Sequence, residues 1–309
     1  MTLSATKQLL RPFVTVAIPT RNGASRLPRL LAALRDQSYP LESFEVLVAN
    51  NGSSDGTADV VGNAAREGAL TIRHVLEAKR GVNHARNRAI AESSGEFLAF
   101  VDDDELPGPQ WLASLVDGMR QFPHAGCIGG PVTATPARGR SPRTCDRCDL
   151  AEGNFYLDIV GGAADVVGGG NAIFRRSAFE AVGEFNPALS GHGDDYEWML
   201  RSRAAGFPVY YVAAASVVHL HDHVTARAVL KKSFLRALSA AEFEAIAGLP
   251  HPDPASVVSR IPRYLAHSVR YRCWGGVAQS CGAAGRAIGV VQVRMRGRHG
   301  GMCPPSGTA

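Results

Sequence analysis

The sequence has no run of 18 apolar residues, which is the length that a membrane-spanning helix needs. It also has no hydrophobic signal-peptide core at its N-terminus, because Lys7 and Arg11 interrupt the apolar residues there. Cysteine is scarce: the 309 residues include six, unevenly placed, and cytosolic thiols normally stay reduced. Cys145 and Cys148 have the spacing of a metal or redox pair, but no second pair completes four ligands. We therefore expect a cytoplasmic protein, and the role of this cysteine pair stays open.

A strong excess of one charge is also absent. The formal charge of +5 is modest, and much of it could come from a basic C-terminal region. Such a balance gives little reason to expect a nucleic-acid partner and more reason to expect an anionic ligand or a membrane surface. The length is sufficient for one large α/β domain, or for one domain plus an appendage, and the hydrophobic fraction of 45% is typical of a soluble globular protein.

One stretch stands out, residues 95–104, in which an apolar run at 97–101 ends in Asp102, Asp103 and Asp104. The run is typical of a strand buried on both faces, as in the middle of a parallel sheet. Ligands of open α/β sheets bind at the carboxyl ends of the strands, and adjacent carboxylates repel one another unless a cation lies among them. The residues alone therefore leave two interpretations open, a site for a divalent metal and a diphosphate, or a solvated acidic turn.

Strand and helix patterns alternate before this stretch, which predicts a parallel sheet with right-handed crossovers. Each predicted strand is followed by polar or glycine-rich residues, so the loops should converge on one rim of the sheet. The predicted strands cover 13–18, 44–49 and 70–76, and the predicted helices cover 25–34, 57–66 and 83–92.

Several blocks in the same order resemble family 2 glycosyltransferases of the GT-A type, over roughly residues 13–222. The block NNGSSDGT at 50–57 is similar to the family's DDGSxDGT block, and Asp102 to Asp104 occupy its DxD position. The other matching blocks are 14–22, 81–88, 168–171 followed by 174–175, and 194–197. The resemblance implies an α/β GT-A fold, with a Rossmann-like, mostly parallel sheet flanked by helices and a C-terminal helical extension. It also implies inverting, metal-dependent transfer of a sugar from a nucleotide-diphosphate sugar.

The same resemblance assigns candidate donor and metal residues. Asn50 departs from the family's Asp; its amide oxygen can still accept from a uracil N–H, so a UDP-sugar is favoured. The resemblance implies Mg²⁺ or Mn²⁺ as cofactor, held by Asp104 and Asp102 with His219 or His221; a surface role is the alternative for the histidines. The candidate nucleotide-sugar residues are Pro19, Thr20, Arg21, Asn50, Asn51, Ser53, Arg86, Asp102 and Asp103.

Catalysis is assigned by the resemblance to Asp195 as the general base, with Asp194 and Glu197 orienting the acceptor. From the residues alone, this acidic cluster is equally a good helix start. Gly169, Gly170 and Asn171 are expected on the acceptor side, with a structural turn as the alternative. The acceptor itself stays open among a natural product, a peptide and a lipid-linked glycan.

Beyond residue 223 the resemblance fades. Basic, partly amphipathic helical patterns cover 224–247 and parts of 255–290, which suits peripheral membrane contact at the inner face or ordinary packing with a solvated charged face. A homodimer is also a candidate assembly. We predict a glycosyltransferase domain over 1–223, followed by a helical extension over 224–290 and a disordered tail over 291–309. Within the domain, we expect a donor half at 1–110 and an acceptor half at 111–223, which includes a variable insertion at 133–154.

Two other functions compete with sugar transfer. A sugar-phosphate nucleotidyltransferase would share the sheet and the metal, but the loop at 19–23 has one glycine where a triphosphate-binding loop needs several. A non-catalytic nucleotide-sugar-binding protein is disfavoured because Asp102, Asp104 and Asp195 are all present.

Overall fold

The computed structural model describes residues 11–134, 162–164, 167–189, 193–220, 226–246, 248, 250, 252–271 and 275–299. The chain divides into two compact units. The first comprises Met1–Thr135, Gly153–Pro187 and Trp198–Leu220, and the second comprises Pro136–Glu152, Ala188–Glu197 and His221–Ala309.

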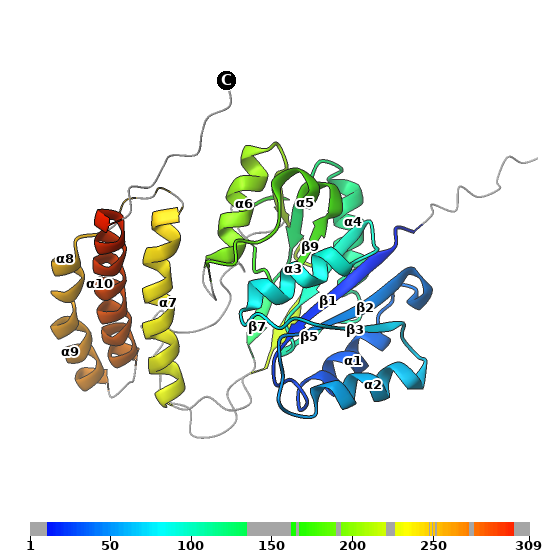
Figure 1. The fold of residues 1–309 in the computed structure, drawn as a ribbon, viewed down its shortest axis with the longest axis horizontal. Coiled ribbons are helices and arrows are strands. Elements are labelled where there is room, and N and C mark those ends of the chain that lie inside the picture. The colour runs from blue at the N-terminus through cyan, green and yellow to red at the C-terminus, as the bar shows by residue number, and fades with distance from the viewer. Residues whose placement is uncertain are drawn as a thin grey trace, which may run out of the picture. The chain divides into compact units, whose positions relative to one another are not determined.

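The first unit is built on an eight-stranded sheet in the order β3-β2-β1-β4-β9-β6-β10-β8 (Figure 1). Its first four strands in the sequence are parallel, as the alternating pattern predicts. These strands are β1 (Val14–Thr20), β2 (Phe44–Asn50), β3 (Ile72–Leu76) and β4 (Phe97–Val101). The helices that follow β1 to β3 are α1 (Leu27–Arg35), α2 (Thr57–Glu67) and α3 (Val82–Glu92).

The other half of the sheet mixes strand directions. Strand β9 (Asn171–Arg175) lies antiparallel between β4 and β6 (Cys127–Gly129), and β10 (Val209–Tyr211) pairs parallel with β6 and antiparallel with β8 (Gly162–Ala163). A second, three-stranded sheet has the order β5-β11-β7. Its strands are β5 (Glu105–Pro107), β7 (Val132–Ala134) and β11 (Val217–His219). The remaining helices are the one-turn η1 (Leu41–Ser43), α4 (Trp111–Gln121), α5 (Arg176–Val182) and α6 (Asp194–Ala204).

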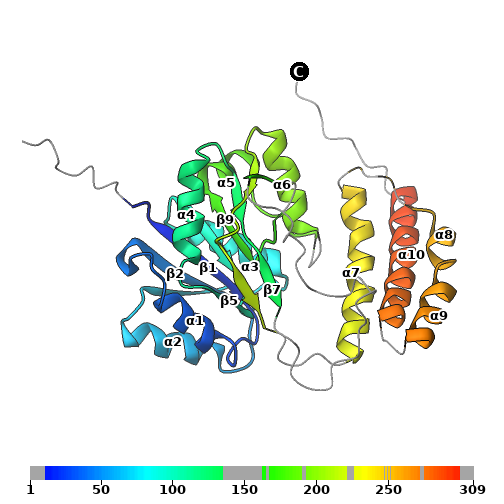
Figure 2. The ribbon, with the colours of Figure 1, turned by 180° about the vertical axis from the view of Figure 1, so that it is seen from behind.

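Each face of the large sheet packs against its own hydrophobic cluster, because alternate side chains of a strand point to opposite faces. Val16 and Ile18 of β1 pack on one face with α1, α2 and α4, whereas Ala17 packs on the other with α3, α5 and the later part of α6 (Figure 2). Phe100 and Phe174 lie edge to face, 5.6 Å between ring centroids, in the second cluster. With both faces covered, the strands that lead to the rim are fixed in place.

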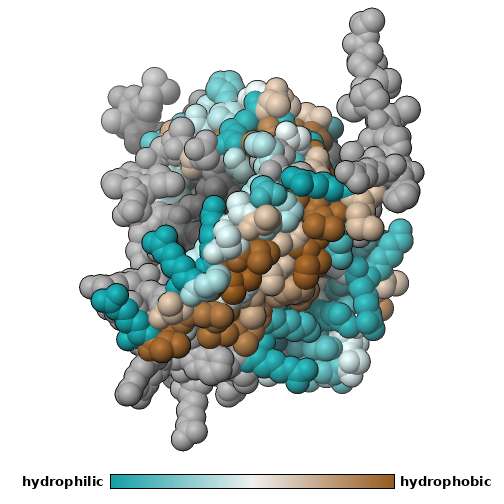
Figure 3. All heavy atoms as spheres, turned by 90° about the vertical axis from the view of Figure 1, so that its left-hand side faces the viewer, coloured by the Kyte–Doolittle hydropathy of each residue, from teal (hydrophilic) through white to brown (hydrophobic). Residues whose placement is uncertain are grey.

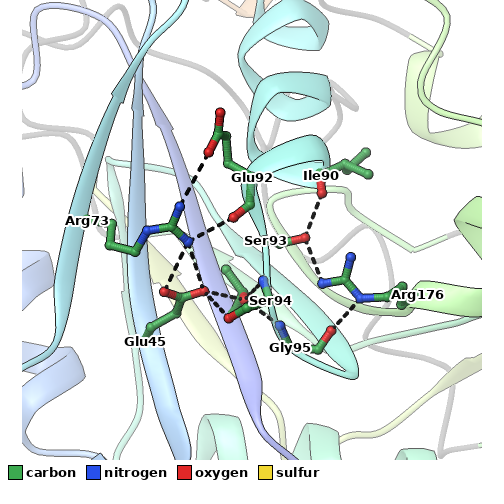
Figure 4. Close-up of polar contacts among 9 residues, drawn as sticks. Glu45, Arg73, Ile90, Glu92, Ser93, Ser94, Gly95 and Arg176 are labelled. Atoms are coloured by element: carbon green, nitrogen blue, oxygen red, sulfur yellow. Dashed lines mark hydrogen bonds and ion pairs between the residues drawn. The ribbon is translucent and has the colours of Figure 1, made fainter.

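The amino ends of the first three strands are joined by a partly buried polar network (Figure 4). Glu45, 4% exposed, accepts hydrogen bonds from Thr15 Oγ1 at 2.9 Å and Ser94 Oγ at 2.8 Å, and Arg73 Nη1 lies 3.3 Å from its Oε2. Arg73 also donates to the carbonyl of Glu92 at 2.8 Å. Burial alone would raise the pKa of Glu45, but the two hydroxyl groups and the charge of Arg73 bring it below its ordinary value. This network lies at the edge of the sheet opposite the carboxyl ends.

The helices of the second unit are α7 (Ala226–Ile246), α8 (Pro254–Val258), α9 (Ile261–Tyr271) and α10 (Gly275–His299). Helix α10 packs closely on α7 because small residues face it: a Cβ on Gly289 would lie only 2.7 Å from the carbonyl oxygen of Leu238. Arg286 of α10 forms an ion pair with Glu244 of α7.

Two predicted boundaries need correction. The disordered tail was predicted from residue 291, but α10 continues through His299, because its packing on α7, α8 and α9 supplies contacts that the local pattern does not reveal. The insertion predicted over 133–154 overlaps β7, which includes residues 133 and 134. Residues 135–154 and 300–309 lie outside the described residues.

Candidate active site

The candidate site is built at the carboxyl ends of β1, β2 and β4. The parallel register aligns Thr20 with Asn50, and it aligns Ala17 with Phe100, so Asp102 and Asp103 follow β4 next to the end of β1. The sheet therefore brings together the loops that the sequence predicts at one rim.

Asp103 stabilises this rim through hydrogen bonds with Arg26 and Thr20. Arg26 donates to both of its carboxylate oxygens, Nε to Oδ1 at 2.9 Å and Nη2 to Oδ2 at 2.7 Å. Thr20 Oγ1 donates to Oδ2 at 2.5 Å. The hydrogen bond with Asp103 is the main reason why the pKa of Arg26 is raised. Both candidate nucleotide residues of this group, Thr20 and Asp103, thus hold the loop after β1 against the loop after β4.

Asp102 faces a different set of groups. Its Oδ1 lies 3.5 Å from Nη2 of Arg86, which is itself only 6% exposed. Gly170 lies directly against the other oxygen: a Cβ at position 170 would be 2.5 Å from Asp102 Oδ2 and 3.2 Å from Glu105 Oε2. The absence of a side chain at residue 170 therefore makes room for the two carboxyl groups.

Glu105, the first residue of β5, is a buried acid that the sequence analysis missed. It is 4% exposed, and its Oε2 has no hydrogen-bond partner among the described residues. Burial raises the pKa of its carboxyl well above the ordinary value, and the charges of Asp102 and Asp104 raise it further. The signal was present as a fourth acidic residue directly after the triplet, but only the structure shows that it is buried.

Asp104 meets His219 across the small sheet. His219 Nε2 lies 3.4 Å from Asp104 Oδ2, and the N–H of Leu220 donates to the Asp104 carbonyl at 2.8 Å. His219 is also the register partner of Glu105 in the β5–β11 pair. The structure thus brings together two predicted metal residues, Asp104 and His219, whereas His221 lies outside the described residues.

The donor set fits a divalent cation. Asp102 and Asp104 offer carboxylate oxygens that are each about a third exposed (37%), and Glu105 places an unpartnered buried oxygen beside them. Among the described residues, no three His, Cys, Asp or Glu side chains already form a metal-binding group. Mg²⁺ and Mn²⁺ commonly take one or two carboxylates from the protein and the remaining oxygens from phosphates and water. The carboxylates present here match that pattern.

The loop after β2 carries the other candidate nucleotide residues. Asn50, 2% exposed, accepts from the Ser53 N–H at 2.9 Å, and its Nδ2 lies 3.2 Å from His74 Nε2. Ser53 Oγ in turn accepts from the N–H of Asn22 at 2.9 Å. Asn51 donates to the carbonyls of residues 77 and 79 and accepts from the N–H of Gly81, so its amide holds the next loop in place. Pro19 is buried within β1, and Arg21 is exposed at the rim.

The prediction for Asn171 needs correction. Its side chain is fully buried: Oδ1 accepts from Trp111 Nε1 at 2.7 Å, and Nδ2 donates to the carbonyls of Pro131 and Ala215. Both amide protons are used inside the protein, so Asn171 holds β9 in place and does not face an acceptor. Gly169 is buried in the turn with Gly170.

The predicted base lies at the start of α6. Residues 194–197 belong to the second unit and the rest of the helix to the first. Asp194 and Glu197 are 5% and 8% exposed, whereas Asp195 is more accessible and accepts from the Tyr196 N–H at 2.9 Å. Gly193 precedes the helix at φ 82°, and the ring of Phe243 on α7 lies within 3 Å of where its Cβ would be.

Comparison with known proteins decides the family. The model of glycosyl transferase family 2 matches residues 15–183, which is more than half of the chain. The chain is a family 2 glycosyltransferase. Its match covers the rim, the acidic triplet and Gly170, and the architecture is the GT-A fold with C-terminal helices.

Relatives of this family 2 glycosyltransferase support the same conclusion. Glycosyltransferase AglE of Haloferax volcanii is 32% identical over 72% of this chain and 71% of that protein. Validoxylamine A glucosyltransferase of Streptomyces hygroscopicus subsp. jinggangensis is 38% identical, over 43% of this chain and only 30% of its own length. The mannosyltransferase PcManGT of Pyrobaculum calidifontis, solved with GDP-Man and Mn²⁺, shares the fold with a TM-score of 0.60 and 19% identity, over 97% of this chain and 79% of that one. The protein is therefore an enzyme that transfers a sugar.

The part of this glycosyltransferase that the structure describes contains no helix with both the length and the hydropathy needed to cross a bilayer. Cys145 and Cys148 lie outside the described residues. Besides Glu105, sequence reasoning missed Arg26, because nothing in the local pattern indicates that it pairs with Asp103 across 77 residues.

Proposed function

We propose that this glycosyltransferase moves a sugar from a UDP-linked donor to an acceptor hydroxyl or other nucleophile in one inverting displacement, with a bound divalent cation. The observation that carries the proposal is the placement of Asp102 and Asp104 at the carboxyl end of β4, next to the rim formed by Thr20 and Asn50. A nucleotide at this rim has polar contacts on one side and carboxylates on the other, which suits a base and ribose followed by a metal-bound diphosphate.

The donor base is proposed from the environment of Asn50. Its Oδ1 already accepts from the Ser53 N–H, and its second lone pair could accept from the N3–H of uracil. TarS of Staphylococcus aureus, which shares the fold with a TM-score of 0.53 at 16% identity over 92% of both chains, was solved with UDP and with UDP-GlcNAc. PcManGT was solved with GDP-Man, so the fold accommodates more than one base and a direct comparison is needed.

Asp104 and His219, together with Asp102, would hold Mn²⁺ or Mg²⁺. When bound, such an ion stabilises the negative charge that grows on the departing diphosphate. Arg86 supports the arrangement by facing Asp102, and Gly170 leaves the space that this carboxylate occupies. The ion pair of Asp103 with Arg26 keeps the third carboxylate of the triplet on the loop after β1.

Asp195 is proposed as the general base. It removes the proton of the acceptor hydroxyl while that oxygen bonds to the anomeric carbon, and the bond to the diphosphate breaks on the opposite face with its electron pair leaving on the diphosphate. Its greater accessibility distinguishes it from Asp194 and Glu197, which are buried and suited to bracing the start of α6 or orienting the acceptor. General base catalysis of this kind contributes about 10²–10⁴-fold.

Binding and turnover can be tested separately. Thermal unfolding with Mn²⁺ and a panel of UDP, GDP and dTDP sugars should show the largest stabilisation with a UDP-sugar, because a ligand that binds the folded state raises its melting temperature. Hydrolysis of that sugar nucleotide should then fall about 10²–10⁴-fold in Asp195→Asn while the thermal shift persists. No stabilisation by any sugar nucleotide would refute the donor site, and unchanged turnover in Asp195→Asn would refute the base.

A further inference from the structure

The basic residues of this protein are unevenly distributed. Residues 254–309 contain eight arginines and no aspartate or glutamate. Since the whole chain has a formal charge of +5, residues 1–253 carry −3. The positive charge therefore belongs to the segment that forms α8, α9 and α10, and not to the glycosyltransferase sheet.

The same three helices expose large apolar side chains. They carry Val258 (45% exposed), Leu265 (43%), Val269 (80%), Ile288 (44%), Val291 (44%) and Met295 (57%). These are six of the eleven exposed large hydrophobic residues that the described part of the chain contains, so the apolar surface is concentrated there. Figure 3, which views the second unit from the side of these helices, shows hydrophobic residues in a continuous band beside strongly hydrophilic ones. We call this surface the α8–α10 face.

The orientation of α10 makes this exposure unusual. An ordinary surface helix turns its large apolar residues inward. Helix α10 instead packs on α7 with the small residues Gly282, Gly285 and Gly289, and its larger residues Ile288, Val291 and Met295 are exposed. These three follow the i, i+3, i+7 spacing of one helix face. Because the interior contacts are already made, the outward apolar residues are available to a partner.

Arginines lie beside this apolar face. Arg260, Arg263 and Arg294 are all exposed, and in α9 the apolar pair Leu265 and Val269 is one turn apart on the same side of the helix. Helices that lie in a membrane interface combine exposed apolar residues with arginine or lysine in this way. A nucleic-acid surface would use the arginines but would gain nothing from exposed leucine, valine and methionine.

We propose that the α8–α10 face binds the surface of an anionic lipid bilayer. The apolar side chains enter the headgroup region, and the arginines pair with lipid phosphates and other anionic headgroups. Each basic residue near such a surface contributes about 1 kcal/mol, so the removal of two should lower vesicle binding about 30-fold. The proposal does not depend on the sugar donor or on catalysis.

Co-flotation of the full chain with vesicles tests it at physiological salt. Vesicles with 30% phosphatidylglycerol in phosphatidylcholine should carry the protein, and pure phosphatidylcholine should carry at least tenfold less. The double variants Leu265→Glu/Val269→Glu and Arg263→Gln/Arg294→Gln should each lose binding to the anionic vesicles. Leu76→Glu is the matched control, because Leu76 is a 66% exposed apolar residue of β3 in the first unit and should have no effect.

Thermal unfolding and sedimentation of every variant accompany the flotation. The arginine double variant replaces only exposed residues, so it keeps the test decisive even if the glutamate double variant unfolds. The proposal is refuted if wild type does not float, if it floats equally with neutral vesicles, or if Leu76→Glu is as defective as the helix variants. It is also refuted if the protein dimerises through this face, or binds a labelled single-stranded RNA with it, and does not bind the vesicles.

Discussion

Replacement of Gly170 by alanine should damage the active site without unfolding the protein. The added Cβ would lie 2.5 Å from Oδ2 and 2.7 Å from Cγ of Asp102, whereas ordinary van der Waals contact begins at about 3.4 Å. The methyl group cannot move away, because it is fixed to the backbone of the turn that precedes β9. The carboxylate of Asp102 must therefore shift by about 1 Å, and such a displacement of a positioning group can reduce a rate about 100-fold.

The effect on stability should be much smaller. Asp102 is 37% exposed, so its carboxylate can turn toward solvent at little cost in free energy. Alanine in place of glycine also restricts the unfolded chain, which stabilises the folded state by about 0.4–1 kcal/mol when the backbone conformation allows it. Gly170 is not among the described glycines with a positive φ. We expect the melting temperature of Gly170→Ala to stay within a few degrees of wild type.

Gly168→Ala is the matched control. It lies two residues away in the same segment, but its Cβ would be 3.9 Å from the nearest atom, Cγ2 of Val132, which is an ordinary contact. Donor turnover with Mn²⁺ should fall about 100-fold in Gly170→Ala and stay within threefold of wild type in Gly168→Ala. Equal activity of both variants would show that the close approach of residue 170 to Asp102 does not matter for the reaction.

Three further predictions concern other parts of the chain. Glu45→Gln should lower the free energy of unfolding by about 1 kcal/mol at pH 7, since the partly exposed Arg73 loses one of its two carboxylate partners. Because the folded-state pKa of Glu45 is lowered, this difference should shrink as the pH falls below the carboxyl's ordinary value. A constant difference in urea unfolding from pH 7 to 3 would contradict this prediction. Gly193→Ala should lower the free energy of unfolding by about 1–3 kcal/mol, because the positive φ of residue 193 and the nearby ring of Phe243 both disfavour a side chain there. Calorimetry of the variant and wild type measures this difference in stability. His219→Ala should weaken Mn²⁺ binding at least about tenfold, measured by isothermal titration in the presence of UDP. Binding of UDP without metal should be unchanged. Equal Mn²⁺ affinity of the variant and wild type would exclude His219 from the metal site.

Much of the sheet could be predicted because its information is local. Strands β1, β2 and β4 are mostly apolar segments of five to seven residues bounded by polar turns, and the helices between them repeat their apolar residues with helical spacing. The order of these segments then predicts parallel pairing and a common rim of polar loops, where open α/β sheets bind their ligands. The position of Asp102 and Asp104 at that rim follows from the same reasoning.

The roles of individual polar residues could not be predicted in this way. Asn171 sits in a glycine-rich segment that suggests a ligand contact, yet Trp111, Pro131 and Ala215 use its amide completely. These partners lie 40 to 60 residues away, and no local pattern records them. The antiparallel insertion of β9 between β4 and β6 is equally a long-range pairing, and it is this strand that brings Gly170 to the carboxylates.

The acidic cluster shows why long-range contacts matter for function. In the sequence, residues 102–105 are four similar acids, and any of them could ligate a metal. In the fold, their surroundings differ: Arg26 pairs with Asp103, and Arg86 faces Asp102. Unpaired charges are strongly disfavoured where water is excluded, and Glu105 is almost fully buried. This burial raises the pKa of Glu105, and the nearby charges of Asp102 and Asp104 raise it further. We propose that a divalent cation held by Asp102 and Asp104 would offset the negative charge of this cluster.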